Sequence, residues 1–216
     1  MTQLKTQNSK RKTAPPLGVV ILGSGASSRM GRPKLLLPWG KTSIIGHLLE
    51  QWQALAAQIA VVCRPGDREL SAELDRLGFP PHDRIENPQP ERGMFSSILC
   101  AARWPGWRKE ISSRAVVLGD QPHLRLETLR ALLEFSVQNP DAICQPTFNG
   151  RAGHPVILPS GVFVELKRSR AETLKDFLKP FAGRCVQCPV ADAGLLLDLD
   201  RPEDYEKAVK SHFGKL

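Results

Sequence analysis

The chain has 216 residues, of which 41% are hydrophobic, and it carries a formal net charge of +8 at pH 7. This length and composition can bury a sizeable core within one domain. No apolar run approaches the roughly 20 residues that cross a bilayer, and the polar N-terminus lacks the apolar segment of a secretory signal. We therefore expect a cytoplasmic protein with no membrane partner.

The positive charge is unevenly distributed. Residues 1–16 contain Lys5, Lys10, Arg11 and Lys12 and no acidic residue, so they hold four of the eight excess charges. Their low apolar content predicts a disordered basic tail over 1–16, followed by a folded domain over 17–216. The folded part has no basic stripe interleaved with aromatic residues, which excludes stacking on nucleic-acid bases.

Short apolar runs alternate with stretches of helical period along the first two thirds of the chain. The runs 18–22, 59–63, 115–118 and 141–144 predict strands, and the stretches 43–58, 67–77, 95–104 and 126–138 predict helices between them. This alternation predicts right-handed crossovers and a mainly parallel sheet covered on both sides. Ligands of such sheets bind beyond the carboxyl ends of the strands.

The pattern changes after Gly150. Residues 151–158 predict a strand entered through a turn, and helices are expected near 163–167 and 173–181. Strands are predicted at 184–190 and 195–199, and a closing helix runs from Pro202 to about Ser211. The segment elaborates the same sheet, so a single α/β domain is the prediction.

The loop after the first strand carries the strongest functional signal. Its small residues let backbone N–H groups approach an anion, and Arg29 and Lys34 supply positive charge, so it is suited to hold a polyphosphate. It is not a Walker loop, because Lys34 lies between a proline and a leucine. It is not a dinucleotide fingerprint either, because Ser28 occupies the place of the third glycine.

This loop reads Gly-x-Ser-x-Arg-Met-Gly-x-x-Lys from Gly25, followed by x-Leu-Leu-Pro-x-Gly. It resembles the signature loop of the nucleotidyltransferases that attach a nucleoside monophosphate to the molybdenum cofactor. The resemblance covers about 17–204 and implies the nucleotide-diphospho-sugar transferase type of fold, a Rossmann-like three-layer sandwich. It implies nucleotide contacts at Leu22, Gly23, Ser24, Gly25, Ser27, Arg29, Gly31 and Lys34. The family has Leu-Ala-Ala-Gly or Leu-Ala-Gly-Gly at 22–25, so the choice between CTP and GTP stays open, with CTP preferred.

The motif Gly119-Asp120-Gln121-Pro122 follows the strand at 115–118 directly. A carboxylate there lies at the same sheet edge as the first loop and can hold Mg²⁺, although Asp120 can instead cap the next helix. The motif resembles that of the molybdenum cofactor cytidylyltransferases, in which the aspartate binds the metal. Together with Arg29 and Lys34, Asp120 is therefore the expected catalytic set.

A second acidic motif contains Asp198 and Asp200. At a spacing of two on a strand both face one side and can meet one Mg²⁺ ion, but Asp200 before Pro202 and Glu203 also fits a helix N-cap. The segment resembles the Asp-x-Asp-Thr-Pro-Glu-Asp close of this superfamily, with Arg201 replacing the threonine. On that pattern Asp200 is the first choice of metal ligand and Asp198 the second.

Three weaker signals remain. Residues 87–97 resemble the family's Asn-Pro…Gly-Met-x-x-Ser segment, which implies nucleotide contacts at Gly93 and Ser97; the alternative is an ordinary first helical turn. The turn Gly153-His154-Pro155 resembles a family turn near the acceptor, so His154 is a candidate substrate contact or a structural histidine. Cys185 and Cys188 have the spacing of half a zinc site or a redox pair, but an ordinary strand with two buried thiols is favoured.

The resemblance implies a Mg²⁺-dependent molybdopterin cytidylyltransferase that releases pyrophosphate and serves a molybdoenzyme or its chaperone. A phosphate monoester is already nucleophilic near neutral pH, which agrees with the lack of a Ser-His-Asp or Cys-His arrangement. Two alternatives stay open: a transferase of the same fold acting on a sugar or alditol phosphate, and a non-catalytic nucleotide- or cofactor-binding chaperone.

Overall fold

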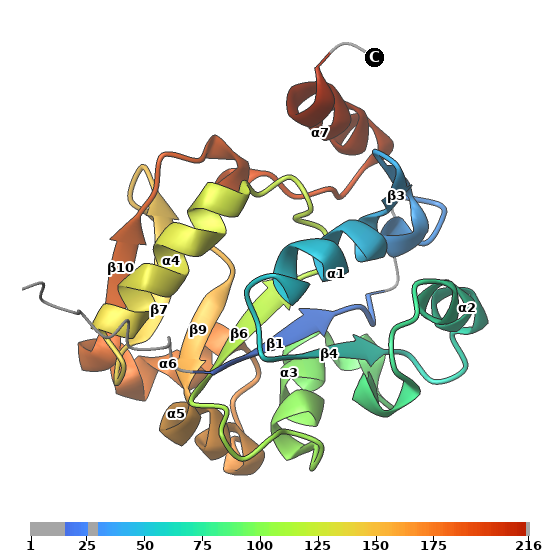
Figure 1. Cartoon of the computed structure of the whole chain (residues 1–216). Helices are drawn as coiled ribbons and strands as arrows, with labels where there is room; N and C mark the ends of the chain where they lie inside the picture. The colour runs from blue at the N-terminus through green and yellow to red at the C-terminus, as the bar shows by residue number, and fades with distance from the viewer. Residues whose placement is uncertain (1–15, 26–29, 215–216) are drawn as a thin grey trace, which may run out of the picture.

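The computed structural model describes residues 16–25 and 30–214. Its main sheet has the strand order β10-β7-β9-β6-β1-β4-β5, with β8 paired to β7 (Figure 1). The strands are β1 (Leu17–Leu22), β4 (Gln58–Cys63), β5 (Arg84–Glu86), β6 (Ser113–Leu118), β7 (Ile143–Phe148), β8 (Arg151–Ala152), β9 (Val156–Pro159) and β10 (Cys185–Pro189). β1 is parallel to both β4 and β6, whereas β9 is antiparallel to β6 and β7. The predicted mainly parallel α/β sheet is therefore confirmed.

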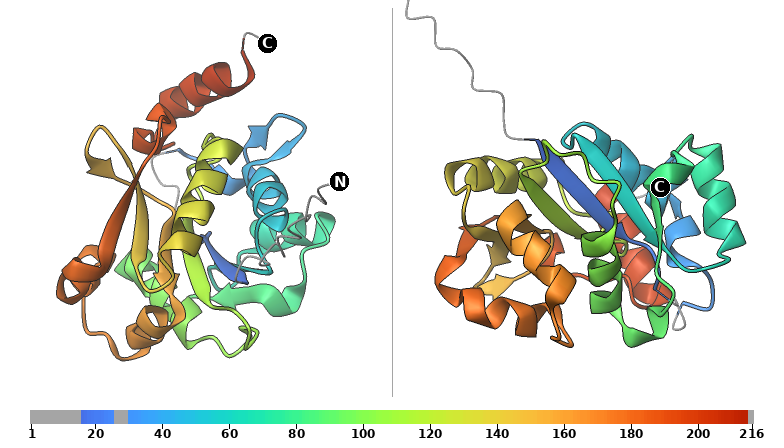
Figure 2. Two further views of the ribbon diagram at one scale, coloured as in Figure 1. Left: turned by 60° about the vertical axis from the view of Figure 1, so that its left-hand side comes forward. Right: turned by 90° about the horizontal axis from the view of Figure 1, so that it is seen from below.

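Helices cover both faces of this sheet, which makes three layers (Figures 1 and 2). The α-helices are α1 (Ile44–Gln53), α2 (Arg68–Arg76), α3 (Met94–Arg103), α4 (Leu126–Gln138), α5 (Ser160–Glu165), α6 (Leu174–Leu178) and α7 (Pro202–Phe213). Residues of α1, α2 and α4 pack in one apolar cluster, and residues of α3, α5 and α6 pack in a second cluster on the other face. Two clusters form because successive side chains of a strand point to opposite faces of the sheet. In β1, Val19 and Ile21 belong to the first cluster and Val20 to the second, and all three are fully buried.

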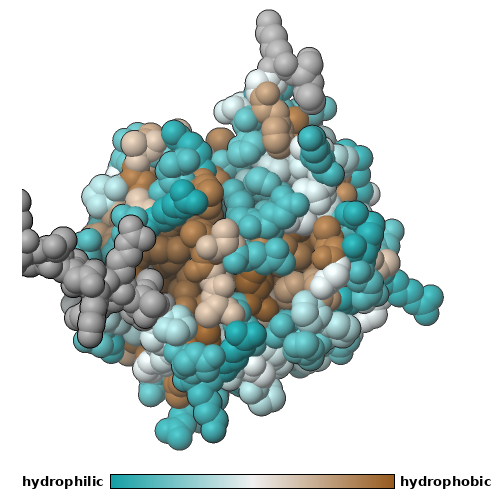
Figure 3. Space-filling model, in the orientation of Figure 1, coloured by the Kyte–Doolittle hydropathy of each residue, from teal (hydrophilic) through white to brown (hydrophobic). Residues whose placement is uncertain are grey.

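The helical layer in front is not continuous. Figure 3 shows apolar residues gathered at the molecular surface between α4 and α1. A cavity of about 230 Å³ lies there, lined mainly by residues from the amino ends of β1 and β6 and from the end of α4, among them Leu17, Ser113, Leu133 and Val137. It is at the opposite edge of the sheet from the loops that carry the motifs.

Several predicted boundaries differ from the observed ones. The helix expected to reach residue 58 ends at Gln53, because Gln58 begins β4 and its side chain donates to the carbonyl oxygen of Gly106 at 2.8 Å. The strand expected over 151–158 is broken into β8 and β9 by a turn at Gly153. The short helices near 163–167 and 173–181 are α5 and α6, each continued by 3₁₀ turns.

The strand predicted at 195–199 is wrong. Residues Ala193–Leu196 form a 3₁₀ turn (η6), and no strand of the described chain includes 197–200. The cause is local: the Asp192 carboxylate accepts the N–H of Gly194 at 3.0 Å, which gives the backbone an alternative to sheet pairing. Asp198 and Asp200 therefore lie in an irregular segment before α7.

The N-cap prediction for Asp200 is also wrong, since Arg201 occupies that position. The backbone N–H of Arg201 donates to the Asp204 carboxylate at 3.2 Å, so the helix start is satisfied without Asp200. The Asp200 side chain is thereby available for the site described below.

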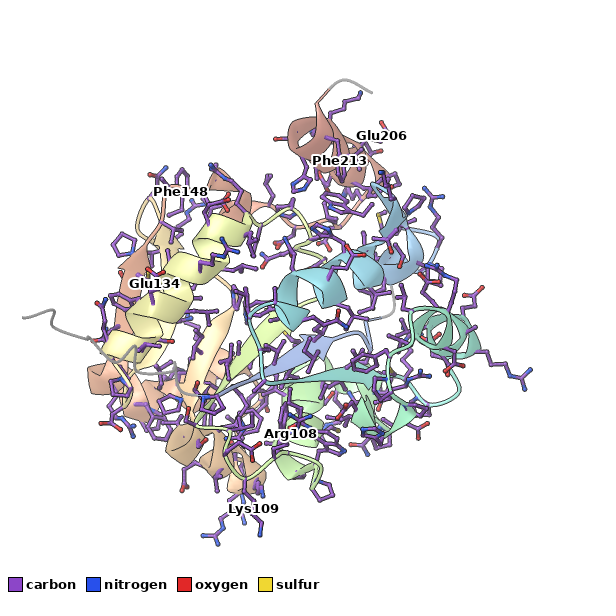
Figure 4. The ribbon with its side chains drawn as sticks, viewed as in Figure 1. Arg108, Lys109, Glu134, Phe148, Glu206 and Phe213 are labelled. Atoms are coloured by element: carbon purple, nitrogen blue, oxygen red, sulfur yellow. The ribbon has the colours of Figure 1, made fainter. Side chains whose placement is uncertain are left out.

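The strands β2 (Pro38–Trp39) and β3 (Thr42–Ser43) form a hairpin that was not predicted. Helix α7 packs against this hairpin. Trp39 is 1% exposed, and its ring lies 5.3 Å from that of Phe213, which Figure 4 labels on α7. The hydroxyl of Tyr205, also on α7, donates to the carbonyl oxygen of Pro38 at 2.5 Å. The last helix thus stands at one end of the molecule, held by this aromatic cluster (Figure 2).

The remaining sequence predictions concern the tail and the cysteines. Except for Pro16, the tail predicted at 1–16 lies outside the described residues. The predicted strand with Cys185 and Cys188 is β10, and its two thiols pack in the clusters on opposite faces of the sheet. Within the described chain, no helix is both long and apolar enough to cross a bilayer.

Candidate active site

The motif loops meet where two neighbouring strands end. β1 and β6 run side by side with Leu22 opposite Leu118, so Gly23 and Gly119 follow at the same sheet edge. From β1 the chain runs outward through β4 to β5 and then returns to β6 on the other side of β1, and this reversal of strand order is the switch point where such sheets bind ligands. A side chain at Gly119 would lie 2.8 Å from the Leu22 carbonyl oxygen, and one at Gly23 would lie 2.9 Å from that of Val62. Glycine is needed at both positions for the loops to come this close.

A cavity of about 420 Å³ opens beyond these strand ends. Four segments that are far apart in sequence form it: the first loop with Lys34, the start of α3, the loop after β6, and the segment before α7 that carries Asp200. The lining residues include Leu22, Gly23, Ser24, Gly25, Lys34, Gly93, Met94, Ser97, Asp120 and Asp200. Its size and its mixture of apolar wall and few polar groups are typical of a small-molecule site.

Lys34 connects the two carboxylates of the cavity. It begins the 3₁₀ turn η1 (Lys34–Leu36), and its ammonium Nζ lies 2.7 Å from Oδ1 of Asp200 and 3.6 Å from Oδ2 of Asp120. The Lys34 side chain is only 15% exposed. Residues 34, 120 and 200 are thus brought together into one charged group, as the sequence predicted.

The Asp120 carboxyl is held in an unusual environment. Burial raises its pKa above the ordinary value for aspartate; the charge of Lys34 acts against this shift, and Asp198 and Asp200 add to it. Oδ1 of Asp120 is buried and has no hydrogen-bond partner among the described residues. A buried acceptor without a donor, beside a second carboxylate, is a suitable ligand pair for a hard cation.

The described residues contain no cluster of three or more histidine, cysteine, aspartate or glutamate side chains that would hold a metal by themselves. Mg²⁺ does not require one, because it is usually bound through one or two carboxylates together with substrate phosphates and water. The pair of Asp120 and Asp200 therefore fits this ion when a phosphorylated ligand is bound.

A buried polar network supports the part of the cavity wall that the first loop and the start of α3 form. The hydroxyls of Ser24 and Ser97 lie 2.6 Å apart, and the amide of Asn87 donates to the hydroxyls of Ser96 at 2.8 Å and Ser97 at 3.0 Å. Asn87 is 1% exposed, and its carbonyl oxygen accepts the N–H of Gln89. This network ties the first loop to the start of α3 and leaves Gly93, at a φ of 81°, on the cavity surface.

Arg64 is a residue that the sequence argument missed. It follows β4 directly, and its Nε donates to the carbonyl oxygen of Ser24 at 2.9 Å. The available signal was positional, since any polar residue just after a parallel strand lies at the ligand-binding edge. Arg64 lines a second cavity of about 400 Å³ that shares Gly23, Gly25 and Lys34 with the first.

His154 and Asp198 are outside the cavity that contains Lys34. His154 Nδ1 lies 3.3 Å from the carbonyl oxygen of Val116, and burial lowers the pKa of the imidazole, while this hydrogen bond and Asp198 act in the opposite direction. Asp198 accepts a hydrogen bond from the Gln121 amide at 3.4 Å. Both residues therefore lie near the Asp120 loop but do not touch Lys34 in the described contacts.

A family model for the MobA-like NTP transferase domain matches residues 19–187. The match covers both motif strands, Lys34 and Asp120, and more than three quarters of the chain. The chain belongs to the MobA-like NTP transferase family. Its resemblance to the molybdenum cofactor nucleotidyltransferases, and its fold, are thereby confirmed.

Named relatives of this NTP transferase agree with that assignment. It is 26% identical over 190 residues to the molybdenum cofactor cytidylyltransferase of Escherichia coli (strain K12), covering 86% of this chain and 92% of that protein. It is also 26% identical over 204 residues to a Bacillus cereus (strain Q1) protein named "Probable molybdenum cofactor guanylyltransferase", with coverages of 88% and 94%. The crystal structure of Rv0371c from Mycobacterium tuberculosis H37Rv is similar, with a TM-score of 0.69 and 26% identity over 92% of this chain and 99% of that one. A manganese complex of Rv0371c gives a TM-score of 0.65 at 23% identity, with coverages of 91% and 99%.

Some predicted nucleotide contacts of this NTP transferase are not placed by these observations. Ser27 and Arg29 lie outside the described residues. Gly31 is described, with a φ of 67°, but it does not line the cavity. The roles of these three residues, like those of the other predicted contacts, stay predictions.

Proposed function

We propose that this NTP transferase moves CMP from CTP onto the terminal phosphate of a molybdopterin acceptor, with release of pyrophosphate and with Mg²⁺ as the divalent cation. One observation carries the proposal. The ammonium of Lys34 and the carboxylates of Asp120 and Asp200 converge in a cavity that is also lined by the backbone of residues 23–25.

Lys34 is suited to exchange partners when the triphosphate binds. In the structure its ammonium bonds to Asp200 and lies near Asp120. A triphosphate in the cavity presents anionic oxygens that compete for this ammonium, and Lys34 then balances phosphate charge. The carboxylates of Asp120 and Asp200, no longer paired with Lys34, can then bind the cation.

Asp120 and Asp200 would hold Mg²⁺, which supplies charge stabilisation to phosphate oxygens. The buried, unpaired Oδ1 of Asp120 supports its role as the principal ligand. The Asp200 side chain is 43% exposed, so it can move to meet the incoming nucleotide. The other contribution to catalysis is the positioning of the substrates. The Ser24–Ser97–Asn87 network keeps the first loop rigid, so the loop reorganises little during the reaction.

The acceptor attacks the α-phosphorus of CTP with an oxygen of its terminal phosphate, and the bond from that phosphorus to the β-phosphate bridging oxygen breaks. Pyrophosphate leaves with the electron pair. The attacking oxygen is already anionic near neutral pH, so no strong general base is required. We assign His154 and Asp198 to the acceptor side, because both lie beyond Asp120 and outside the cavity that holds Lys34.

One feature supports CTP over GTP: the motif Gly119-Asp120-Gln121-Pro122 resembles that of the cytidylyltransferases. We further propose that the protein acts in the cytoplasm, in keeping with five free cysteines, and delivers its product to a molybdoenzyme or that enzyme's chaperone.

The test is pyrophosphate release by the purified full-length protein with CTP, GTP, ATP or UTP, each with molybdopterin, a sugar phosphate or an alditol phosphate, in Mg²⁺ or EDTA. We expect release with CTP, molybdopterin and Mg²⁺ together. Lys34→Ala should lose it, whereas Lys41→Ala, an exposed lysine in the β2–β3 turn, should retain it. Release with only a sugar or alditol phosphate would overturn the acceptor assignment, and nucleotide binding without release for any acceptor would overturn the enzymatic one.

A further inference from the structure

The segment that carries Asp198 and Asp200 has no strand pairing to fix it. It runs between β10 and α7 and contains only the short turn η6. Asp120, by contrast, is only two residues beyond the end of β6, which pairs with a strand on each side. A reaction that needs Asp120 and Asp200 together therefore needs another device to hold the two loops at a defined separation.

Asp192 provides a buried anchor between the two loops. Its side chain is 4% exposed, and its carboxylate accepts hydrogen bonds from Thr128 Oγ1 at 2.7 Å, the Arg125 N–H at 3.1 Å and the Gly194 N–H at 3.0 Å. The guanidinium of Arg125 lies 3.5 Å from the same carboxylate and donates to the carbonyl oxygen of Ala191 at 2.8 Å. Both carboxylate oxygens are thus satisfied, by donors from the start of α4 and from η6.

Two more contacts continue from this anchor toward the cavity. His123 Nε2 lies 2.9 Å from the carbonyl oxygen of Gly194, and the Gln121 amide donates to the Asp198 carboxylate at 3.4 Å. The two segments therefore run in opposite directions along these contacts: residues 128, 125, 123 and 121 contact, in that order, residues that ascend from 192 through 194 to 198. We call this row of contacts the loop seam. It ends where Lys34 joins Asp120 to Asp200.

Asp192 itself does not line the cavity, so it has no direct contact with a ligand there. The carboxylate is also kept charged: burial raises its pKa, but the bonds from Thr128, Arg125 and Gly194 and the charge of Arg125 outweigh burial and leave it below the ordinary aspartate value. A charged acceptor holds its donors more strongly than a neutral one.

We infer that Asp192 is a positioning residue, which through the loop seam sets the distance of Asp198 and Asp200 from Asp120. The inference rests on the proposed function, because it assumes that Asp120 and Asp200 act together. It predicts that breaking the seam at its far end impairs the metal-dependent part of the reaction and leaves nucleotide binding without metal intact.

The test uses two substitutions that keep side-chain size. Asp192→Asn removes the charge, and Thr128→Val removes one donor, while Thr128→Ser restores that hydroxyl. The matched control is Asp176→Asn in α6, whose carboxylate accepts from the Thr173 hydroxyl at 2.6 Å in a solvent-exposed hydrogen bond. Four quantities are measured: kcat, the Mg²⁺ concentration for half-maximal pyrophosphate release, the Kd for CTP in EDTA, and amide hydrogen exchange over residues 193–200.

We expect Asp192→Asn to lower kcat and to raise the half-saturating Mg²⁺ concentration by about 10-fold to 100-fold, the range for residues that orient metal ligands. Thr128→Val should show part of this change and Thr128→Ser none. The Kd for CTP in EDTA should stay constant, and exchange over 193–200 should accelerate in Asp192→Asn but not in Asp176→Asn.

A lowered melting temperature with unchanged kcat, Mg²⁺ requirement and exchange over 193–200 would overturn the inference, because Asp192 would then be merely structural. Failure of the proposed function is distinguishable from this result. If the wild type releases no pyrophosphate, hydrogen exchange and titration of the CTP-bound protein with Mn²⁺ still compare the variants, and equal Mn²⁺ affinity with equal exchange would refute the role of the seam.

Discussion

Replacing Gly119 by alanine tests whether the two motif strands must approach closely at the site. The added Cβ would lie 2.8 Å from the carbonyl oxygen of Leu22 and 2.8 Å from Cδ2 of Leu35. Ordinary contact begins at 3.4 Å, so each approach is short by 0.6 Å. The Leu35 side chain can rotate away, but the carbonyl of Leu22 belongs to the central strand β1 and cannot move alone.

Overpacking of this kind costs about 2 kcal/mol of unfolding free energy. For a domain of this length that is a fall of roughly 4–8 °C in melting temperature. The relaxation also displaces Asp120, the next residue, by about half an ångström, which corresponds to a loss in kcat of about 10-fold.

Thermal unfolding followed by circular dichroism and pyrophosphate release from CTP measure the two effects. Gly161→Ala is the control, since a Cβ there meets no atom within 4 Å and the site lies in helix α5, so its melting temperature should rise slightly. If Gly119→Ala unfolds at the wild-type temperature and keeps full activity, the close approach of β1 and β6 has no importance for the site.

Three further results are expected. Lys34→Ala should lower kcat/KM for CTP by about 100-fold or more, because the triphosphate loses a buried charge partner; steady-state kinetics with varied CTP checks this, and an unchanged value would exclude Lys34 from the site. Asn87→Ala should lower the free energy of unfolding in urea by about 3 kcal/mol, because it loses three N–H···O hydrogen bonds and a weaker one from the Cys100 thiol; Asn139→Ala, which loses one part-buried bond at a helix end, should lower it by less than about 1 kcal/mol, and equal losses would contradict the buried network. The folded-state pKa of Asp192 is lowered, so its ionisation stabilises the protein above the ordinary aspartate pKa of about 4 and this stabilisation is lost as the pH falls below it. The stability difference between wild type and Asp192→Asn should therefore be constant at neutral pH and shrink in acid, and a difference that grows in acid would have the wrong sign.

Much of the fold could be predicted from the sequence because its signals are local. The strands β1, β4 and β6 are continuous apolar runs, and the helix predicted over 67–77 is confirmed as α2 with Asp67 as its N-cap. Two motifs that directly follow parallel strands must lie at one sheet edge. Topology alone therefore predicted that the first loop and Asp120 would meet.

The rest depends on contacts between distant segments. A strand at 195–199 has the right apolar spacing, but Asp192 turns the chain into η6 and binds the start of α4 instead. The spacing of Asp198 and Asp200 gave no indication that one would bond to Gln121 and the other to Lys34. The contribution of Arg64 was equally hidden, because it reaches a backbone carbonyl, and the sequence pattern does not specify such a partner.

The central claim is that CMP, with the α-phosphate of CTP, moves to the acceptor. It is tested most directly with CTP radiolabelled at that phosphate. The purified protein is incubated with labelled CTP, molybdopterin and Mg²⁺, and the acceptor is separated from the nucleotide. The account predicts that label appears in the acceptor in equal amount to the unlabelled pyrophosphate released, and that Asp120→Asn abolishes both while its circular dichroism spectrum stays native. Label that remains in nucleotide, or transfer by Asp120→Asn at the wild-type rate, would contradict it.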